Sequence, residues 1–268
     1  MSTALDRPAK AGVPLEEIVS YLDDILQTAA TPDYPGAVNG LQLANRGTVS
    51  KVAAAVDFST ETVTAAIEQN ADLLLVHHGM FWSGVQPIVG RRYSRLAKLF
   101  DSDMAIYSSH LPLDRHPQIG NNVLLARTLG LEPSGGFARF NDIFIGVQGI
   151  SETPTRVLID RAKLFSTGHG GNTIAPVSLA SRVTHRWAIC TGSGASRETL
   201  DEAAHDGIDT LIVGEGPHWT AIDAADCGLA IIYVGHYASE TLGIYALAAN
   251  LNRQFDLEWV KISAPTGL

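Results

Sequence analysis

The chain has 268 residues, enough to bury a substantial core in one large domain or two modest ones. Hydrophobic residues make up 46% of the chain and charged residues 18%, an ordinary globular composition that excludes disordered and collagen-like classes. The formal net charge of −9 argues against nucleic-acid partners and against an anionic membrane surface, because both require a basic patch.

The two cysteines, Cys190 and Cys227, lie in apolar surroundings and form no C-x-x-C motif, so we expect reduced thiols and a cytoplasmic protein. Residues 1–12 are expected to form a flexible tail. They are not expected to be a signal peptide, because they contain charged residues and proline instead of the apolar segment that a signal peptide needs. The sequence has no apolar run of about 18 residues, so we expect no transmembrane helix.

Apolar periodicity predicts alternating helices and strands in the first half of the chain. The predicted helices cover residues 15–29, 60–70, 93–101 and 121–129, and the predicted strands cover residues 51–58, 72–76 and 104–108. Short apolar strands that alternate with helices pair in parallel, with the helices packed on the faces of the sheet. Residues 39–42, Asn-Gly-Leu-Gln, predict a turn.

The middle of the chain is less regular, and the alternation then restarts. We expect a strand over residues 142–150, a helix over 153–165 and a loop rich in Gly, Ser and Thr over 166–182. In the second half, the predicted strands cover residues 186–190, 209–213, 230–234 and 257–262, and the predicted helices cover residues 196–206, 219–227 and 239–255. Residues 13–268 are therefore expected to form a single α/β unit of two lobes, about 13–130 and 184–268, joined by residues 131–183.

Two pairs of segments read as copies of each other. Residues 52–82 match 187–219, and residues 105–114 match 231–240. The matched residues are Asp72 with Asp209, Gly79 with Gly216, Trp82 with Trp219, His110 with His236 and Asp114 with Glu240. We therefore predict an internal duplication: two similar α/β halves with mostly parallel sheets. Because ligands of such sheets bind beyond the carboxyl ends of the strands, a metal site is expected in the cleft between the halves.

Histidines and carboxylates gather at these predicted strand ends. His77 and His78 directly follow an apolar strand, and adjacent imidazoles diverge, which suits two metal ions better than one. His110 precedes Asp114, and His236 precedes Glu240, by four residues each, and a carboxylate can bridge two metals. Taken alone, the His77-His78 pair is equally well explained as a solvated strand end, and each of the other two motifs is more often a carboxylate at a helix N-terminus beside a histidine with satisfied partners. Their repetition in two copies favours a two-metal site.

The donor types narrow the choice of metal. Mixed nitrogen and oxygen donors favour Zn, Fe, Mn, Co or Ni, whereas an all-protein Ca or Mg site uses mainly oxygen. Glu215 and His218 occupy the repeat positions of His78 and Phe81. They are either a general base or a substrate contact near the metals, or they are simply the polar start of a helix. The glycine-rich loop over residues 191–196 precedes a helix, so it is either a phosphate site or, more often, a simple turn.

Several motifs together resemble one known family. They are VNGLQ, DLLLVHHGMFW, SSHLPLDRHPQIGNN, GEGPHW, GHYASETLG and the terminal PTGL. This set, which spans nearly the whole chain, resembles the dinuclear metal centre proteins labelled GTP cyclohydrolase 1 type 2 homologues, in a short form without an inserted domain.

The resemblance implies that His77 and Asp114 bind one metal, that His78 and His236 bind the other, and that Glu240 bridges both. His110 is not among the ligands that the resemblance implies, and the repeat makes it a catalytic candidate or a residue that supports the ligands. The resemblance also implies a toroidal homohexamer with its metal sites facing the interior.

Two classes of function follow from these residues. The first is a metal-dependent hydrolase that acts on a small molecule, GTP or a related nucleotide, or on a phosphoester; bound water would become a usable hydroxide at neutral pH. Glu215, His218 and His110 are the candidates for proton transfer in this reaction. The second is a non-catalytic metal-binding or regulatory scaffold. Open coordination positions and a polar cleft would favour the enzyme.

Overall fold

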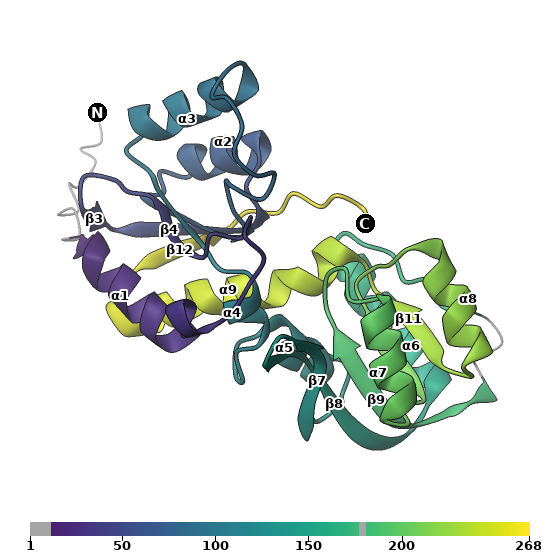
Figure 1. The fold of residues 1–268 in the computed structure, drawn as a ribbon. Coiled ribbons are helices and arrows are strands. Elements are labelled where there is room, and N and C mark those ends of the chain that lie inside the picture. The colour runs from purple at the N-terminus through teal and green to yellow at the C-terminus, as the bar shows by residue number, and fades with distance from the viewer. Residues whose placement is uncertain (1–11, 177–180) are drawn as a thin grey trace, which may run out of the picture.

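The computed structural model describes residues 12–176 and 181–268 of the chain, which form an α/β fold with two mixed five-stranded sheets (Figure 1). Apart from Gly12, the expected tail over residues 1–12 lies outside the described residues. In the described part of the chain, no helix has the length and apolar character needed to cross a membrane.

The first sheet has the strand order β12-β4-β5-β6-β2. Its strands are β2 (Gly40–Leu43), β4 (Lys51–Asp57), β5 (Leu73–His78), β6 (Ala105–Ser108) and β12 (Glu258–Lys261). Three of the four pairings are parallel, and β2 closes the edge antiparallel to β6. A short antiparallel pair of β1 (Val13–Pro14) and β3 (Thr48–Val49) lies beside it.

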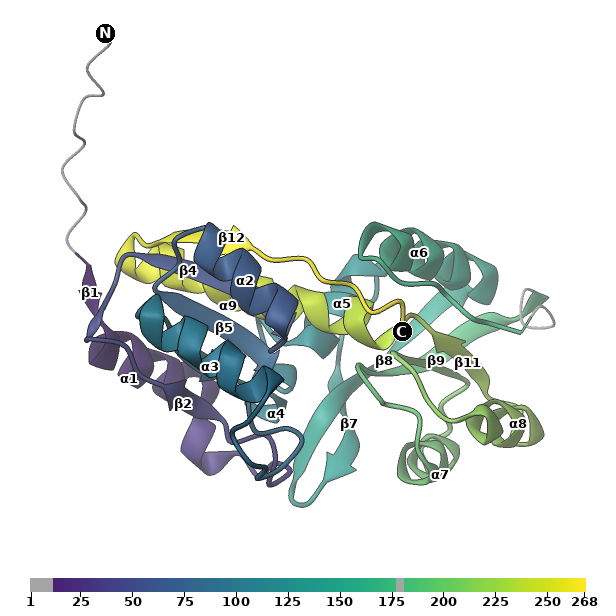
Figure 2. The same ribbon diagram turned by 90° about the horizontal axis from the view of Figure 1, so that it is seen from above.

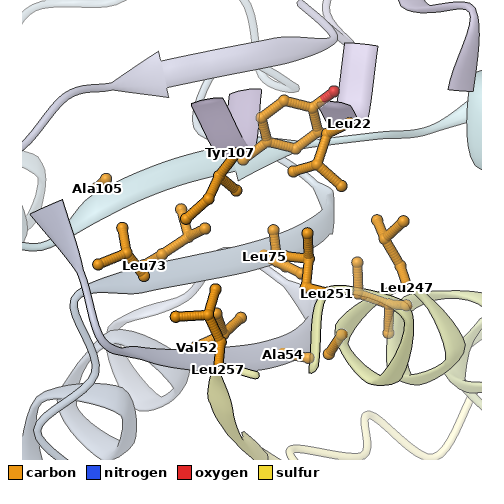
Figure 3. Close-up of a cluster of buried hydrophobic side chains, with 14 of the residues drawn as sticks. Leu22, Val52, Ala54, Leu73, Leu75, Ala105, Tyr107, Leu247, Leu251 and Leu257 are labelled. Atoms are coloured by element: carbon orange, nitrogen blue, oxygen red, sulfur yellow. The ribbon is translucent and has the colours of Figure 1, made fainter. Parts of the chain in front are cut away.

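Helices cover both faces of the first sheet (Figures 1 and 2). They are α1 (Leu15–Leu26) and α9 (His236–Phe255) on one face, and α2 (Thr60–Glu68) and α3 (Arg91–Asp101) on the other. Successive strand residues point to opposite faces, so Leu73 and Leu75 pack against α1 and α9, whereas Leu74 packs against α2 and α3. Figure 3 shows Leu75 beside Leu247 and Leu251 of α9. Burial on both faces explains the continuous apolar runs.

The second sheet has the order β11-β10-β9-β8-β7. Its strands are β7 (Gly135–Phe140), β8 (Ile143–Pro154), β9 (Val183–Cys190), β10 (Thr210–Val213) and β11 (Ala230–Tyr233). Strands β9, β10 and β11 are parallel, and β8 and β7 continue the sheet antiparallel. Its helices are α5 (Asn121–Thr128) and α6 (Thr155–Gly168) on one face, and α7 (Arg197–His205) and α8 (His218–Asp226) on the other.

The parallel parts of the two sheets are built alike. The order β4-α2-β5-α3-β6 recurs as β9-α7-β10-α8-β11. Ser59 and Thr62 form a capping box at α2, and Ser196 and Thr199 form the same box at α7. Each box satisfies N–H groups at the start of the helix that follows a parallel strand. The recurrence therefore fixes where side chains after each strand lie.

Three features differ from the expectations. The first sheet is mostly parallel as expected, but the second is half antiparallel, because the chain between the expected lobes supplies β7 and β8 to it. Residues 39–42 were expected as a turn, but β2 begins at Gly40, whose φ of +105° makes the bend that admits an edge strand. β12 was expected with the second lobe, yet it pairs with β4 of the first sheet.

Helix α9 explains the return of the chain to the first sheet. Its 20 residues span about 30 Å at the rise of an α-helix. Near its start, Ala238 packs in the core of the second sheet, whereas Leu247 and Leu251 further along pack in the core of the first. Figure 2 shows the helix running from one sheet to the other. The start of α9 thus lies between the two sheets.

Candidate metal centre

Two neighbouring histidines end strand β5. His77 is fully buried, and its Nδ1 donates a hydrogen bond to the carbonyl oxygen of Ser109 at 2.8 Å. His78 follows it, and its Nδ1 contacts Oδ1 of Asp57 at 2.8 Å. Asp57 ends the neighbouring strand β4 and lies opposite His78 in the strand register. The parallel pairing of β4 and β5 therefore brings an imidazole and its carboxylate partner together.

Two further histidines begin helices at the ends of strands. His110 caps the short helix α4 (Leu111–Asp114) after β6, and its Nδ1 contacts Oδ1 of Asp33 at 2.8 Å. His236 is the first residue of α9 after β11, and its Nδ1 contacts Oε1 of Glu215 at 2.7 Å. A carbonyl or carboxylate oxygen can only accept, so each Nδ1 carries the proton. In the neutral imidazole the lone pair is then on Nε2, and this is the form in which histidine binds a metal.

The carboxylate of Glu240 lies among these Nε2 atoms. Its Oε1 is 3.5 Å from Nε2 of His77. Its Oε2 is 3.1 Å from Nε2 of His236 and 3.5 Å from Nε2 of His78. Asp114 completes the first group, with Oδ2 3.6 Å from Nε2 of His77. One oxygen of Glu240 therefore faces His77, while the other faces His78 and His236.

Asp114 is held by a chain of amide hydrogen bonds. The Nδ2 group of Asn121 donates to Oδ1 of Asp114 at 2.8 Å, and Oδ1 of Asn121 accepts from the backbone N–H of Gly243 at 2.7 Å. A side chain at Gly243 would overlap Asn121, so glycine permits this close approach of α5 to α9. The chain of contacts fixes Asp114 relative to the helix that carries Glu240.

Burial and the neighbouring charges shift the pKa values of the site residues in opposite directions. Burial by itself lowers the pKa of His77, but the carboxylates of Asp114 and Glu240 outweigh it and raise the pKa to about 10. Burial likewise lowers the pKa of His236, and Glu240 and Glu215 raise it to about 9. Burial raises the pKa of Glu240, yet the charges of His78 and His77 bring it well below its usual range. Without a metal, the imidazoles and carboxylates compensate one another.

The donor atoms fit a metal better than they fit one another. Nε2 of His77 and Oε2 of Glu240 are buried without a hydrogen-bond partner, although buried polar atoms almost always have one. Two sets of donors each lie within 4.8 Å of one another: His77 with His78 and His110, and His78 with His236 and Glu240. Two adjacent clusters of this kind are consistent with a metal site.

The loop after β9 leaves room for the cluster. Gly192 has a φ of +63°, and a Cβ atom there would overlap the carboxylate of Glu240 and lie 3.4 Å from Nε2 of His236. Its backbone N–H donates to Oγ of Ser239 at 3.0 Å, and its carbonyl oxygen accepts from the N–H of Glu215 at 2.8 Å. Glycine is thus required at this position by conformation and by space.

A cavity of ≈ 200 Å³ opens beside the cluster. His78, His110, Asp114, His236 and Glu240 all line it, so the donors face open space rather than a closed core. The rest of its lining comes from Tyr34 and Trp82, from the end of β9 and the loop after it, and from Leu111, Asn122 and Ile145. A reactant can therefore reach the donor cluster directly.

Comparison with known proteins identifies the family of this chain. A model of the family described as Duf34/NIF3 (NGG1p interacting factor 3) matches residues 13–266. The chain belongs to this family. The NIF3-family chain is 38% identical over 260 residues to the "GTP cyclohydrolase 1 type 2 homolog" of Deinococcus radiodurans, covering 94% of each chain.

Solved structures resemble the NIF3-family chain over almost its full length. Protein ybgI, described as of unknown function, is 33% identical with a TM-score of 0.85, over 96% of this chain and 100% of that one. TTHA1606 from Thermus thermophilus is 34% identical with a TM-score of 0.79, again over 96% and 100%. The resemblance to this family that the motifs predicted is therefore confirmed.

The structure brings most of the predicted site residues together. Four of the five expected metal ligands and His110 line one cavity. The fifth ligand, His77, contacts Asp114 and Glu240, which line it. Glu215 does not line this cavity but accepts a hydrogen bond from His236, which does. His218 is exposed at the start of α8 and lines a different pocket, together with Glu215. The roles of Glu215 and His218 in proton transfer stay predictions.

Sequence reasoning missed the residues that orient the histidines. Asp33 and Ser109 come from loops, where no periodic pattern marks them. Asp57 had a usable signal, because it ends the strand next to the one that ends in His78. The loop over residues 191–196 was weighed as a phosphate site or a turn; the structure places Thr191, Ser193 and Gly194 on the cavity wall.

Proposed function

We propose that this NIF3-family chain is a hydrolase that depends on two divalent transition-metal ions, Zn, Fe or Mn. The observation that carries the proposal is the position of Glu240, whose two carboxylate oxygens face different imidazoles. His77 and Asp114 would hold one ion and His78 and His236 the other, with Glu240 as the bridge. Nitrogen and oxygen donors without thiolate suit these metals.

When bound, the two ions would supply a Lewis acid and lower the pKa of a water molecule. The chain's own residues keep the donors in place. Asp57, Glu215 and the carbonyl oxygen of Ser109 each accept a hydrogen bond from the Nδ1–H group of a histidine and thereby fix its tautomer and ring direction. Such partners make the Nε2 atom of each histidine more basic, and they hold the ring in the orientation that metal binding requires.

His110 is the best placed group to move a proton. Its ring lies 4.9 Å from that of His77 and 5.6 Å from that of His78, at the edge of the cavity. Burial raises the pKa of Asp33, but its hydrogen bond with His110 and the charge of His110 outweigh this and lower it. Asp33 therefore stays ionised and stabilises the imidazolium that forms when His110 takes up a proton. Glu215 and His218 remain further candidates.

The substrate we propose is a small molecule, GTP or a related nucleotide, with a phosphoester as the alternative. The support is the name of relatives such as the "GTP cyclohydrolase 1 type 2 homolog" of Pyrococcus abyssi, which is 37% identical to this chain. On grounds of charge we do not expect a nucleic-acid partner, since the chain carries a net charge of −9.

Metal analysis and turnover measured on the same samples test the proposal. Protein purified without added metal, and protein loaded with Zn, Mn or Fe, should carry close to two ions per chain and hydrolyse a nucleotide or a phosphoester. His110→Gln should retain the ions and lose most of the turnover. Failure to take up any of the three metals would overturn the proposal.

The second candidate, a non-catalytic metal-binding or regulatory scaffold, predicts a different result. A site of that kind is closed by its protein ligands, whereas this donor cluster borders a cavity. If the loaded protein holds two ions but turns over none of the nucleotides and phosphoesters, the scaffold is favoured. The cavity is our reason for preferring the enzyme.

We also propose that the chain assembles with copies of itself, as a homohexamer. Large apolar side chains are exposed together on the loop before α3 and on α3 itself: Val85, Ile88, Val89, Tyr93 and Phe100. Exposed apolar patches of this kind mark interaction surfaces. Light scattering should give six times the chain mass, and Val89→Glu should reduce it; an unchanged monomer mass in both proteins would contradict the assembly.

A further inference from the structure

The cavity beside the donor cluster has two unlike walls. One wall carries the rings of Trp82 and Tyr34, whose side chains are 42% and 51% exposed although they lie at a concave site. The ring of Trp82 lies 4.6 Å from that of His110 and 5.1 Å from that of His78, so it stands beside the donors. A second wall, formed by the loop after β9, carries the small residues Thr191, Ser193 and Gly194.

Hydrogen bonds hold the aromatic wall in place. Gln42 of β2 accepts from the N–H of Met80 at 2.6 Å and donates to the carbonyl oxygens of Ala37 and Val38 at 3.0 and 2.9 Å. It thereby joins the loop that carries Tyr34 to the loop that carries Trp82. This link restrains the backbone of both loops, so these loops lose less conformational freedom when a ligand binds.

The small-residue wall contains an unpaired polar atom. The side chain of Thr191 is largely buried, at 8% exposure of the residue, and its Oγ1 has no hydrogen-bond partner. A buried hydroxyl without a partner costs free energy, so such atoms are rare unless a ligand or water completes them. Thr191 lines the cavity, where a bound molecule can supply that partner.

Charge and size limit what the cavity can take. No lysine or arginine is among the described residues that line it, so none of these walls offers a side-chain cation to a polyphosphate. Its volume of ≈ 200 Å³ is below the roughly 300–1,000 Å³ of sites for drug-sized ligands. The space between the walls therefore suits one flat ring system rather than a whole nucleotide.

We infer that this cavity is a stacking subsite for a planar heterocycle, which lies against the ring of Trp82 and hydrogen-bonds to Oγ1 of Thr191 at its edge. The inference rests on the proposed hydrolase function and narrows its substrate. The part of the substrate beside the donor cluster is a nucleobase-like ring, and any phosphate groups extend beyond these walls. A simple phosphoester without a ring is then a poor substrate.

Binding of guanosine, measured by calorimetry on metal-loaded and metal-free protein, tests this subsite. Stacking of a base on an aromatic ring is worth enough that Trp82→Leu should weaken guanosine binding about tenfold or more. Trp82→Phe should keep most of the affinity, because it keeps a ring. Thr191→Val, which has the same shape without the hydroxyl, should weaken binding about threefold to tenfold.

Trp219 supplies the matched control. It occupies the equivalent place in the repeat and is 36% exposed, but its ring lies under the guanidinium of Arg197 at 5.4 Å, outside the cavity. Trp219→Leu should leave guanosine binding unchanged. Binding of inorganic phosphate, measured in parallel, should not respond to Trp82→Leu.

The metal content of every sample separates the two proposals. Protein that holds two ions but does not bind guanosine, or binds it equally well after Trp82→Leu and Trp82→Phe, would overturn the stacking subsite and leave the metal centre intact. Protein that binds guanosine in a Trp82-dependent way without taking up metal would support the subsite and overturn the proposed hydrolase.

Discussion

The two strand–helix units share their order and their helix caps but supply different groups to the site. After β5, His78 points its Nε2 toward Glu240. At the equivalent place after β10, Glu215 instead accepts a hydrogen bond from the Nδ1–H group of His236. His110 and His236 begin equivalent helices, and each has a carboxylate partner. One backbone arrangement can thus position either an imidazole that faces the cluster or the carboxylate that orients an imidazole.

The connections after β4 and β9 show a second difference. α2 begins three residues after β4 ends, whereas α7 begins seven residues after β9 ends. The longer connection contains Gly192, which passes so close to Glu240 that a side chain would overlap the carboxylate. At this connection the second unit therefore brings backbone, and not a side chain, against the carboxylate of Glu240.

The largest effect is expected at the carboxylate that both donor groups share. Glu240→Gln keeps the volume of the side chain but removes the charge that compensates two cations, so both ions should be depleted. Asp114→Asn removes a donor beside His77 alone and should deplete one ion. Elemental analysis of the two variants after identical dialysis checks this. Retention of two ions by Glu240→Gln would show that the bridge is elsewhere.

The same comparison shows how much the sequence could predict. Apolar runs such as β5 are buried on both faces, so their pattern located the strand and placed His77 and His78 at its end. The place of β12 was not predictable in this way, because the pattern of a strand does not say which sheet it joins. That choice depends on the length of α9, which carries the chain back to β4.

The site, like the fold, was predictable only where a sequence pattern marks the residues. Repetition singled out His110, His236, Asp114 and Glu240, because equivalent strand ends meet in space. Asp33 contacts His110 across 77 positions of sequence, and no spacing rule connects two loops at such a distance. The sequence therefore predicted the residues that face the cluster better than those that hold them.

The two histidines that begin equivalent helices should differ in their effect on metal content. His236→Ala removes a donor 3.1 Å from Glu240 and should lose mainly one ion. His110→Ala should keep both ions and lower turnover about 10²- to 10⁴-fold, as expected for a proton-transfer group. Elemental analysis combined with turnover distinguishes them. Loss of an ion from His110→Ala would make His110 a ligand instead.

The imidazoles should make metal binding depend on pH. Since the pKa of His77 is raised to about 10 and that of His236 to about 9, both are protonated in the metal-free chain at neutral pH. Their stabilising charge contacts are complete below the ordinary pKa of 6.5 and are lost as the pH rises through 9 and 10. Metal binding needs neutral imidazoles and displaces these protons, so it strengthens over the same range.

Thermal unfolding of metal-loaded and metal-free protein at pH 6.5, 7.5 and 8.5 measures this effect. The difference between the two Tm values should widen as the pH rises, because the metal-free chain loses stability while the metal binds more tightly. A buffer titration at pH 7 should detect up to about two protons released per chain. A constant Tm difference without proton release would contradict the raised pKa values.

The smallest effects are expected at the carboxylates that orient histidines. Glu215→Ala removes the hydrogen-bond acceptor of the Nδ1–H group of His236. The affinity for one of the two ions should therefore fall by about 10- to 100-fold. Glu215→Gln keeps an oxygen that can accept the same hydrogen bond, so its metal content should stay near two. Asp57→Ala and Asp57→Asn form the matching pair at His78 in the other unit.

Turnover of the two conservative variants then separates orientation from proton transfer. Asp57→Asn and Glu215→Gln both preserve an acceptor, and if both carboxylates only orient histidines, both variants should lose little turnover while they hold two ions. If Glu215 also transfers a proton, Glu215→Gln alone should lose turnover, because an amide cannot take up the proton. Equal metal loss from Glu215→Gln and Glu215→Ala would instead show that His236 depends on the negative charge rather than on the hydrogen bond. The two Asp57 variants would then show whether the carboxylate at the end of β4 acts on His78 in the same way.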